Sequence, residues 1–152
     1  DVRAVCYDES GALWFAAHRD SRTVVVTATK GKSTTTSLIA HLLRSLGVRT
    51  ALAGNIGLPL LELPEAPHAD AVHVIELSSF QAFDADARPT LAVVCNLLEE
   101  HLDWHGTVAQ YRADKMRILD GAGKCLLNAG DPVGSTLRPD APTTWYGQRD
   151  GW

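Results

Sequence analysis

The stretch Thr23-Val24-Val25-Val26-Thr27-Ala28-Thr29-Lys30-Gly31-Lys32-Ser33-Thr34-Thr35 decides the fold. Its first five residues are all β-branched, which is typical of a strand buried on both faces of a parallel sheet. Residues 33–46 then repeat leucine and isoleucine at helical spacing, and Gly47 stands where a helix would end. A buried strand, a short loop with glycine and an amphipathic helix together predict a phosphate-binding loop.

Individual residues of this loop suit the binding of a nucleotide phosphate. Backbone N–H groups at a helix start point toward an anion, and Gly31 lets the backbone approach it closely. Lys32 can reach the terminal phosphates, and the Ser33 hydroxyl can ligate Mg²⁺. Val26 stands where the longer GxxxxGK[ST] pattern has glycine, so a solvated, Ser/Thr-rich helix start is the alternative interpretation. The predicted phosphate-binding residues are Ala28, Thr29, Lys30, Gly31, Lys32, Ser33 and Thr34.

The rest of the chain alternates short apolar runs with helical or long connecting segments. Strands are predicted at 48–53, 72–77, 91–95 and 125–128, with an edge strand near 144–146. A helix is predicted from Thr107 to about Asp120, because Thr107 and Gln110 have capping-box spacing. The alternation predicts an α/β fold with a mostly parallel sheet, helices on both faces and binding residues at the strand ends.

Other segments are predicted to be irregular or peripheral. Residues 54–67, 96–106 and most of 129–152 are expected to be loop. Two apolar runs, 3–7 and 13–17, flank a turn-like spacer and predict a small hairpin. Residues 1–22 are therefore interpreted as a lead-in segment, and residues 23–152 as the main domain.

The composition excludes several classes of protein. The chain has 152 residues, 14 Lys plus Arg against 18 Asp plus Glu, and 45% apolar residues. A formal charge of 14 − 18 = −4 argues against a nucleic-acid binder. No apolar run approaches the roughly 18 residues that span a bilayer, so no membrane insertion is expected. Three scattered cysteines indicate reduced thiols in a cytoplasmic protein. The chain begins at Asp1 without methionine, and we expect it to be a piece of a larger protein.

Four sequence blocks, TKGKSTT, GNIGLPLLE, ELSSFQ and EEHLDWHGTVAQYRADKMRI, resemble the central domain of the Mur ligases. The matching blocks run from about Val24 to Asp131. The resemblance implies a P-loop-NTPase-like fold with a shortened phosphate loop, and an ATP- and Mg²⁺-dependent amide-bond ligase. ELSSFQ and GNIG point to the member that adds D-glutamate to UDP-N-acetylmuramoyl-L-alanine through an acyl phosphate, in peptidoglycan synthesis. Ala28 departs from the family pattern, which usually has glycine there.

The resemblance also implies roles for polar residues outside the loop. Glu76 ends a predicted strand, where a carboxylate can hold Mg²⁺; pairing with a nearby lysine is the alternative. His101 and His105 are four residues apart, but a third soft ligand for zinc is missing. The resemblance makes His101 a ligand of a second Mg²⁺ and leaves His105 at the surface. It places Asn55, Ser78 and Gln81 beside the substrate, although turn chemistry explains Asn55 equally well.

Lys115 is the most informative single residue of the sequence. It falls within the apolar stripe of the predicted helix, where an unpaired ammonium is costly to bury. Pairing with Asp114 or Glu100 is the ordinary explanation. In the Mur ligases the matching lysine is carbamylated, which turns a cation into a carboxylate that helps to hold the second Mg²⁺. The resemblance therefore implies that Lys32, His101 and Lys115 are catalytic.

Several alternatives remain open at this stage. Another Mur ligase or folylpolyglutamate synthase would share the loop and the inward lysine. A P-loop kinase would use the loop without Lys115, and a nucleotide-binding module would lack ligase activity altogether. The uridine-binding N-terminal domain and the amino-acid-binding C-terminal domain of the family are not recognisable in this chain. We therefore expect little ligation by the chain alone, and the resemblance implies a monomer.

Overall fold

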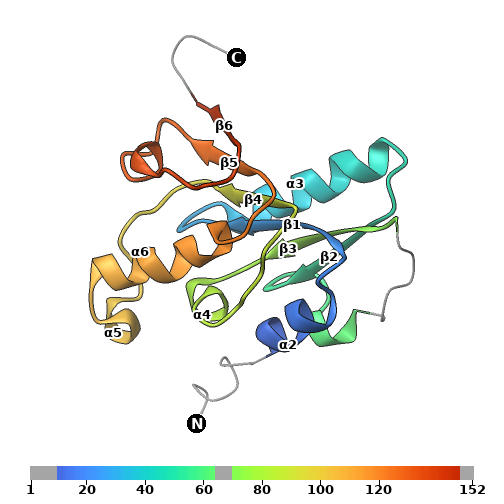
Figure 1. Cartoon of the computed structure of the whole chain (residues 1–152), viewed down its shortest axis with the longest axis horizontal. Coiled ribbons are helices and arrows are strands. Elements are labelled where there is room, and N and C mark those ends of the chain that lie inside the picture. The colour runs from blue at the N-terminus through green and yellow to red at the C-terminus, as the bar shows by residue number, and fades with distance from the viewer. Residues whose placement is uncertain (1–9, 64–69, 148–152) are drawn as a thin grey trace.

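The computed structural model describes residues 10–63 and 70–147, and its framework is one parallel sheet of six strands (Figure 1). The strand order is β2-β3-β1-β4-β5-β6, and every neighbouring pair is parallel. The strands are β1 (Arg22–Thr27), β2 (Thr50–Gly54), β3 (Val72–Glu76), β4 (Leu91–Val94), β5 (Cys125–Asn128) and β6 (Thr143–Tyr146). All the predicted strands from residue 23 onward are confirmed, with bounds shifted by a few residues.

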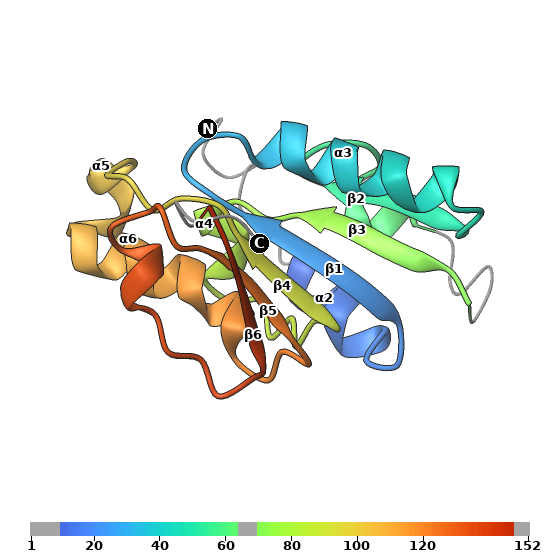
Figure 2. The same ribbon diagram turned by 90° about the horizontal axis from the view of Figure 1, so that it is seen from above.

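Helices cover both faces of this sheet (Figure 2). The α-helices are α2 (Ser10–Ala17), α3 (Lys32–Ser45), α4 (Ser79–Ala82), α5 (Leu102–His105) and α6 (Val108–Met116). Short 3₁₀ turns occur at η1 (Leu60–Glu62), η2 (Arg117–Leu119) and η3 (Gly134–Thr136). Helix α3 lies alone on one face, and α2, α4 and α6 lie on the other. None of the helices in the described part of the chain has the length and apolar character needed to cross a bilayer.

The two faces of β1 enter two separate apolar clusters. Val25 points into the larger cluster, which includes Trp14 of α2, whereas Val24 and Val26 point into the cluster beneath α3. This alternation follows from the period-2 geometry of a strand. Because both faces are covered, every residue of β1 after Arg22 is buried. The β-branched run is therefore confirmed as a central strand.

The predicted N-terminal hairpin is wrong in the part that the structure describes. Residues 10–17 form helix α2, whose Trp14 and Phe15 pack edge to face with ring centroids 5.3 Å apart and enter the main core. The apolar run 13–17 is thus helical, with Trp14 and Phe15 buried, since a short apolar run does not distinguish a strand from a helix. The other expected strand, 3–7, lies outside the described residues.

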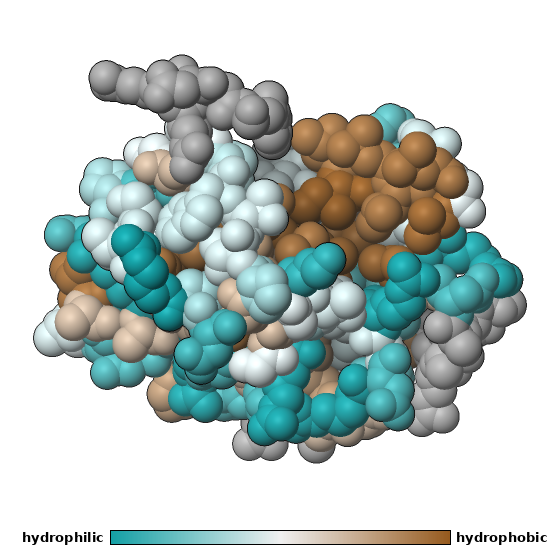
Figure 3. All heavy atoms as spheres, turned by 45° about the horizontal axis from the view of Figure 1, so that its top comes forward, coloured by the Kyte–Doolittle hydropathy of each residue, from teal (hydrophilic) through white to brown (hydrophobic). Residues whose placement is uncertain are grey.

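Two further expectations need correction. The segment 96–106, expected to be loop throughout, contains the short helix α5. Helix α3 exists as predicted, but Leu38, Leu42 and Leu46 of its expected core face are exposed. They lie on a helix that carries an apolar patch on the molecular surface (Figure 3). Thr36 and Ala40 are the buried residues of α3, and Ile39 and Leu43 of the expected face pack, partly buried, against the same sheet cluster.

Candidate functional site

The predicted phosphate loop joins the carboxyl end of β1 to the first turn of α3. Gly31 precedes the helix with φ 83°, in the left-handed region that favours glycine. No side chain caps the N-terminus of α3. The first N–H groups of a helix lack intrahelical partners, so this end of α3 can accept an anion.

Asn96 holds the loop in shape from the neighbouring strand. It follows β4, and its Oδ1 accepts hydrogen bonds from the backbone N–H groups of Thr29 at 3.1 Å and Lys30 at 2.8 Å. Its Nδ2 donates to the carbonyl oxygen of Lys30 at 2.8 Å. Asn96 was missed by sequence reasoning, although its place directly after an apolar strand beside β1 is a usable signal.

The two lysines of the loop have different partners. Lys32 bends back and donates to the carbonyl oxygens of Ala28 at 3.0 Å and Thr29 at 3.2 Å. Lys30 pairs with Glu100 at 2.6 Å, and the pKa of Glu100 is lowered chiefly by this hydrogen bond. Ala28 is fully buried within the apolar cluster beneath α3. Its methyl group therefore belongs to the core, where the extra carbon relative to glycine is accommodated.

Lys115 points inward from α6, as the helical pattern predicted, and is 1% exposed. Its Nζ donates to the carbonyl oxygen of Ala28 at 2.8 Å and lies 3.5 Å from Thr27 Oγ1. The ammonium also lies 5.1 Å from the centre of the Tyr111 ring. The ordinary pairing with Asp114 is not formed, because Asp114 bonds to His105 and Gln110 instead. The predicted inward lysine is thus confirmed.

The environment of Lys115 favours an uncharged amine. Burial, followed by repulsion from Lys32, lowers the pKa of Lys115 to about 7, against weaker opposing effects of Glu100 and Glu76. Glu76 of β3 pairs in register with Val26 of β1, and Lys115 bonds to Ala28 two residues further on, so Glu76, the phosphate loop and Lys115 lie at the same end of the sheet. A neutral amine is the nucleophilic form of lysine.

Glu76 is the last residue of β3, and its carboxylate is buried. The residue is 1% exposed; its Oε1 accepts from Asn55 Nδ2 at 3.3 Å, and its Oε2 is buried without a hydrogen-bond partner. An unpartnered buried carboxylate oxygen is costly in isolation, and a hard cation would satisfy it. Asn55 both occupies the turn after β2 and contacts Glu76, so the two interpretations offered for it are compatible.

The two histidines lie in contrasting surroundings. His101 has φ 55° at the start of α5, and its side chain is 44% exposed, with Nε2 3.5 Å from Glu100 Oε2. Such a backbone conformation is uncommon outside glycine and clusters at functional sites. His105 was expected at the surface, and that expectation is wrong. Its side chain is buried and bonds to Asp114 and Ser79.

Ser78 and Gln81 lie next to one another at the start of α4. The Ser78 hydroxyl accepts from the Gln81 backbone N–H at 3.2 Å, and the Gln81 side chain accepts from the Ser78 N–H at 3.0 Å. This reciprocal pair is a capping box, which sequence reasoning did not identify. At α6 only half of the predicted box forms, because the Gln110 side chain bonds to Asp114. Ser78 and Gln81 thus have a structural role besides the one predicted for them.

A metal ion here would need ligands of mixed chemistry. In residues 10–63 and 70–147, no group of three or more His, Cys, Asp or Glu side chains is arranged to hold a metal ion. The buried oxygen of Glu76 fits a cation, but the other ligands would have to be hydroxyl, imidazole, phosphate or a modified lysine. Such an oxygen-rich set suits Mg²⁺, which usually takes few protein ligands together with substrate phosphates.

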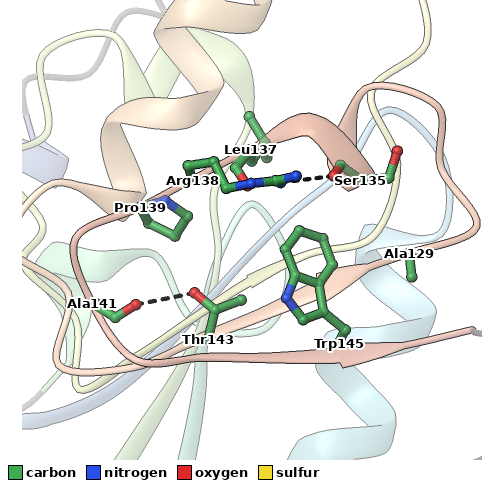
Figure 4. A pocket seen from close by; sticks show the side chains of 8 residues that line it. All are labelled: Ala129, Ser135, Leu137, Arg138, Pro139, Ala141, Thr143 and Trp145. Atoms are coloured by element: carbon green, nitrogen blue, oxygen red, sulfur yellow. Dashed lines mark hydrogen bonds between the residues drawn. The ribbon is translucent and has the colours of Figure 1, made fainter.

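A pocket of about 630 Å³ lies elsewhere, between β6 and the segment after η3 (Figure 4). Trp145 forms one wall, and the Arg138 guanidinium lies 5.8 Å from its ring centre. None of the residues that line this pocket is a predicted site residue. The pocket is therefore separate from the candidate site.

Comparisons with known proteins find similarity to the Mur ligases. A family model described as the Mur ligase middle domain matches residues 26–148. A UDP-N-acetylmuramoyl-L-alanine–L-glutamate ligase of Xylella fastidiosa (strain Temecula1) is 53% identical, over 92% of this chain and 32% of its own. A relative of the same name from a Micromonospora species is 43% identical, over 97% of this chain and 32% of its own length. The chain thus spans about a third of the length of these relatives.

Solved structures are similar in the same region. A UDP-N-acetylmuramoyl-L-alanyl-D-glutamate–2,6-diaminopimelate ligase gives a TM-score of 0.67 at 25% identity, over 86% of this chain and 33% of that one. The MurF ligase from Thermotoga maritima, in complex with ADP, gives a TM-score of 0.69 at 22% identity, over 91% of this chain and 36% of that one. At this low identity, the similarity to the MurF ligase bears on the fold alone. Together they confirm the predicted parallel α/β architecture.

Proposed function

The chain belongs to the Mur ligase family, and from this premise we propose that the full-length protein is an ATP-dependent ligase of peptidoglycan synthesis. It would join glutamate to UDP-N-acetylmuramoyl-L-alanine through an amide bond. The observation that carries the proposal is that Lys115 bonds to Ala28 of the phosphate loop, while Glu76 ends the neighbouring strand in register with Val26. The relatives, at up to 53% identity, carry this reaction in their names.

The proposed amino acid is L-glutamate. The sequence blocks pointed to D-glutamate, whereas the names of the relatives specify L-glutamate. The two substrates differ only in configuration at one carbon. Residues 23–152 would form part of the middle domain, with α2 packed onto it, and the uridine- and amino-acid-binding domains would lie in the rest of the protein. A monomeric state remains a prediction from the resemblance, and a cytoplasmic location remains a prediction from the scattered cysteines.

The reaction needs charge neutralisation and alignment more than covalent chemistry from the protein. The substrate carboxylate attacks the γ-phosphorus of ATP, ADP leaves, and an acyl phosphate forms. The glutamate amine then attacks the acyl carbon, phosphate leaves, and the amine loses a proton. The open N-terminus of α3 would hold the phosphates, and Lys32 would exchange its two loop carbonyls for phosphate oxygens.

The residues present fit a requirement for Mg²⁺. Ser33 and Glu76 would hold one ion, and His101 with a modified Lys115 would hold the other. Bound Mg²⁺ supplies neutralisation of the phosphate charge. The support from this chain is the unpartnered Oε2 of Glu76 and the exposed, backbone-fixed position of His101.

Carbamylation of Lys115 is part of the proposal. The neutral Nζ atom forms a bond to the carbon of CO₂ and loses one proton, so an uncharged amine becomes a carbamate anion. The reacting form is the neutral amine, and the lowered pKa of Lys115 favours this form near neutral pH. A carbamate would also remove the cost of burying an ammonium beside Lys32.

The test is ligation by the full-length protein with each enantiomer of glutamate. We expect phosphate release and amide product, identified by mass spectrometry, with L-glutamate preferred by about 10-fold or more. A Lys32→Ala variant is the control for the phosphate loop. Preference for D-glutamate would overturn the choice of enantiomer only. Binding of Mg²⁺ and ATP without turnover of either enantiomer would leave a nucleotide-binding module and overturn the ligase.

A further inference from the structure

A buried histidine joins two helices beside the candidate site. His105 Nδ1 lies 2.6 Å from Asp114 Oδ2, and His105 Nε2 lies 3.0 Å from Ser79 Oγ. The second oxygen of Asp114 accepts from Gln110 Nε2 at 2.7 Å. Ser79, His105 and Asp114 are 1%, 7% and 3% exposed. We call Ser79, His105 and Asp114 the buried relay.

The buried relay has the hydrogen-bond connectivity of a hydrolase triad, but its serine is not accessible to a substrate. The Asp114 carboxylate accepts a hydrogen bond from the Nδ1–H group, so Nε2 is the acceptor for the Ser79 hydroxyl. A catalytic serine must reach substrate, whereas Ser79 is 1% exposed and lines neither of the pockets found beside β6. The hydrogen bonds of the buried relay therefore stabilise the packing of α4, α5 and α6 against one another.

Each residue of the buried relay lies close in the sequence to a proposed magnesium ligand. Ser79 stands three residues after Glu76, His105 stands four residues after His101, and Asp114 directly precedes Lys115. One imidazole thus links the three segments that carry the proposed magnesium ligands outside the phosphate loop. Such outer contacts commonly fix the direction of metal ligands.

Aromatic packing fixes the imidazole itself. The His105 ring centre lies 4.3 Å from that of Trp104, 5.2 Å from that of Tyr111 and 5.5 Å from that of Phe80. Tyr111 in turn bonds to Thr29 of the phosphate loop at 2.9 Å. A ring held on several sides has little rotational freedom, so its two hydrogen bonds transmit position from α4 to α6.

We propose that His105 is a positioning residue that locks the segments of Glu76, His101 and Lys115 into one geometry for binding Mg²⁺ with nucleotide. This inference rests on the proposed function. The hydrogen bonds to Asp114 and Ser79 act through the position of other side chains, because the His105 ring is buried and both of its nitrogens are occupied by these partners. Loss of these bonds should therefore weaken Mg²⁺-dependent binding more than binding of the nucleotide alone.

The test compares two histidine-to-phenylalanine variants in the full-length protein. His105→Phe keeps an aromatic ring in the cluster and removes both hydrogen bonds. His73→Phe is the matched control, because His73 is also buried, packs on Trp14 at 5.2 Å, and lies at the other end of β3 from Glu76. Ser79→Ala removes one bond and serves if His105→Phe does not fold. The readouts are amide hydrogen exchange, and calorimetric binding of a non-hydrolysable ATP analogue with and without Mg²⁺.

For His105→Phe we expect about 10-fold weaker binding of the analogue with Mg²⁺, as is typical for loss of an outer contact to a metal ligand. Binding without Mg²⁺ should stay within about 2-fold of the wild type, and exchange should quicken in both α4 and α6. Equal loss in His73→Phe, or unchanged exchange in α4 and α6, would overturn the inference. If the wild type shows no binding enhanced by Mg²⁺, the proposed function fails. The locking of α4 to α6 is still decided by hydrogen exchange.

Discussion

The Nζ atom of Lys115 lies 2.8 Å from the carbonyl oxygen of Ala28, so helix α6 is tied directly to the phosphate loop. The same carbonyl accepts a hydrogen bond from Lys32. Two amines therefore converge on one peptide group, and their repulsion helps to keep Lys115 neutral. A carbamate nitrogen retains one N–H group, so the bond to Ala28 can persist after modification.

Replacing Lys115 by alanine should abolish most ligation by the full-length protein. We expect a fall in turnover of about 100-fold or more, since charge stabilisation near transferred phosphate is lost. Formate or acetate should restore part of the rate by occupying the place of the carbamate. Lys124→Ala, at an exposed lysine, is the control. Full activity of Lys115→Ala without added acid would rule out a catalytic carbamate.

The free amine of Lys115 should also make stability depend on pH. Its pKa is about 7 in the folded protein against 10.5 ordinarily, so between these values the unfolded chain binds more protons. The free energy of unfolding should therefore rise with pH from about 7 upward, by at most about 1.4 kcal/mol per pH unit. This contribution is complete above the unfolded pKa and is lost as the pH falls through the folded one.

Urea unfolding in CO₂-free buffer, compared with Lys115→Met, measures this contribution. Other titrating groups cancel in the difference between the two proteins. The wild type should gain stability relative to Lys115→Met as the pH is raised from about 7 to about 9. A constant difference across that range would mean that Lys115 carries an ordinary pKa.

Much of the fold could be predicted from local sequence, for physical reasons that can be named. The β-branched run before Ala28 favours a strand covered on both faces, and the helical spacing around Lys115 predicts an inward lysine. The apolar run at 13–17 failed as a strand because its conformation depends on tertiary packing of Trp14 into the core. Local pattern carries no record of such packing.

The candidate site was predicted where a motif, a family resemblance or an anomalous side chain marked it. Lys115 stood out as a charge within an apolar stripe. Asn96 and Asp114 are ordinary polar residues, and their roles arise from partners 66 and 9 residues away in the sequence. His105 was misplaced at the surface for the same reason, since its burial follows from contacts with α4 and α6.

Asn96 should matter for nucleotide affinity although no phosphate contact was predicted for it. Asn96→Ala removes three hydrogen bonds from Thr29 and Lys30, which frees the loop. We expect about 10-fold weaker binding of an ATP analogue, from about 1.4 kcal/mol of lost preorganisation. Asn96→Asp should bind more weakly still, because a carboxylate would stand beside the phosphates.

Asn128→Ala is the matched control for Asn96, and calorimetric titration provides the measurement. Asn128 is the last residue of β5 and makes comparable bonds, to Cys95 and Gly130, but none to a residue of the loop itself. Its replacement should leave the affinity for the analogue within about 2-fold of the wild type. Equal effects of the two alanine variants would contradict a specific role for Asn96.

Gly54 should tolerate no side chain, because the ends of β2 and β3 approach closely there. A Cβ atom at Gly54 would lie 2.2 Å from the carbonyl oxygen of Glu76, at φ 102°. Gly106 has φ 76°, and a Cβ atom there would meet nothing within 4 Å. Gly106→Ala should therefore cost only the strain of its positive φ, about 1–3 kcal/mol, whereas Gly54→Ala adds a backbone clash and should cost more than about 3 kcal/mol. Urea unfolding of both variants measures this difference, and equal stability of the two variants would show that β2 can move away from β3.

The clash at Gly54 falls on the peptide of Glu76. Gly54→Ala should therefore also weaken Mg²⁺-dependent nucleotide binding.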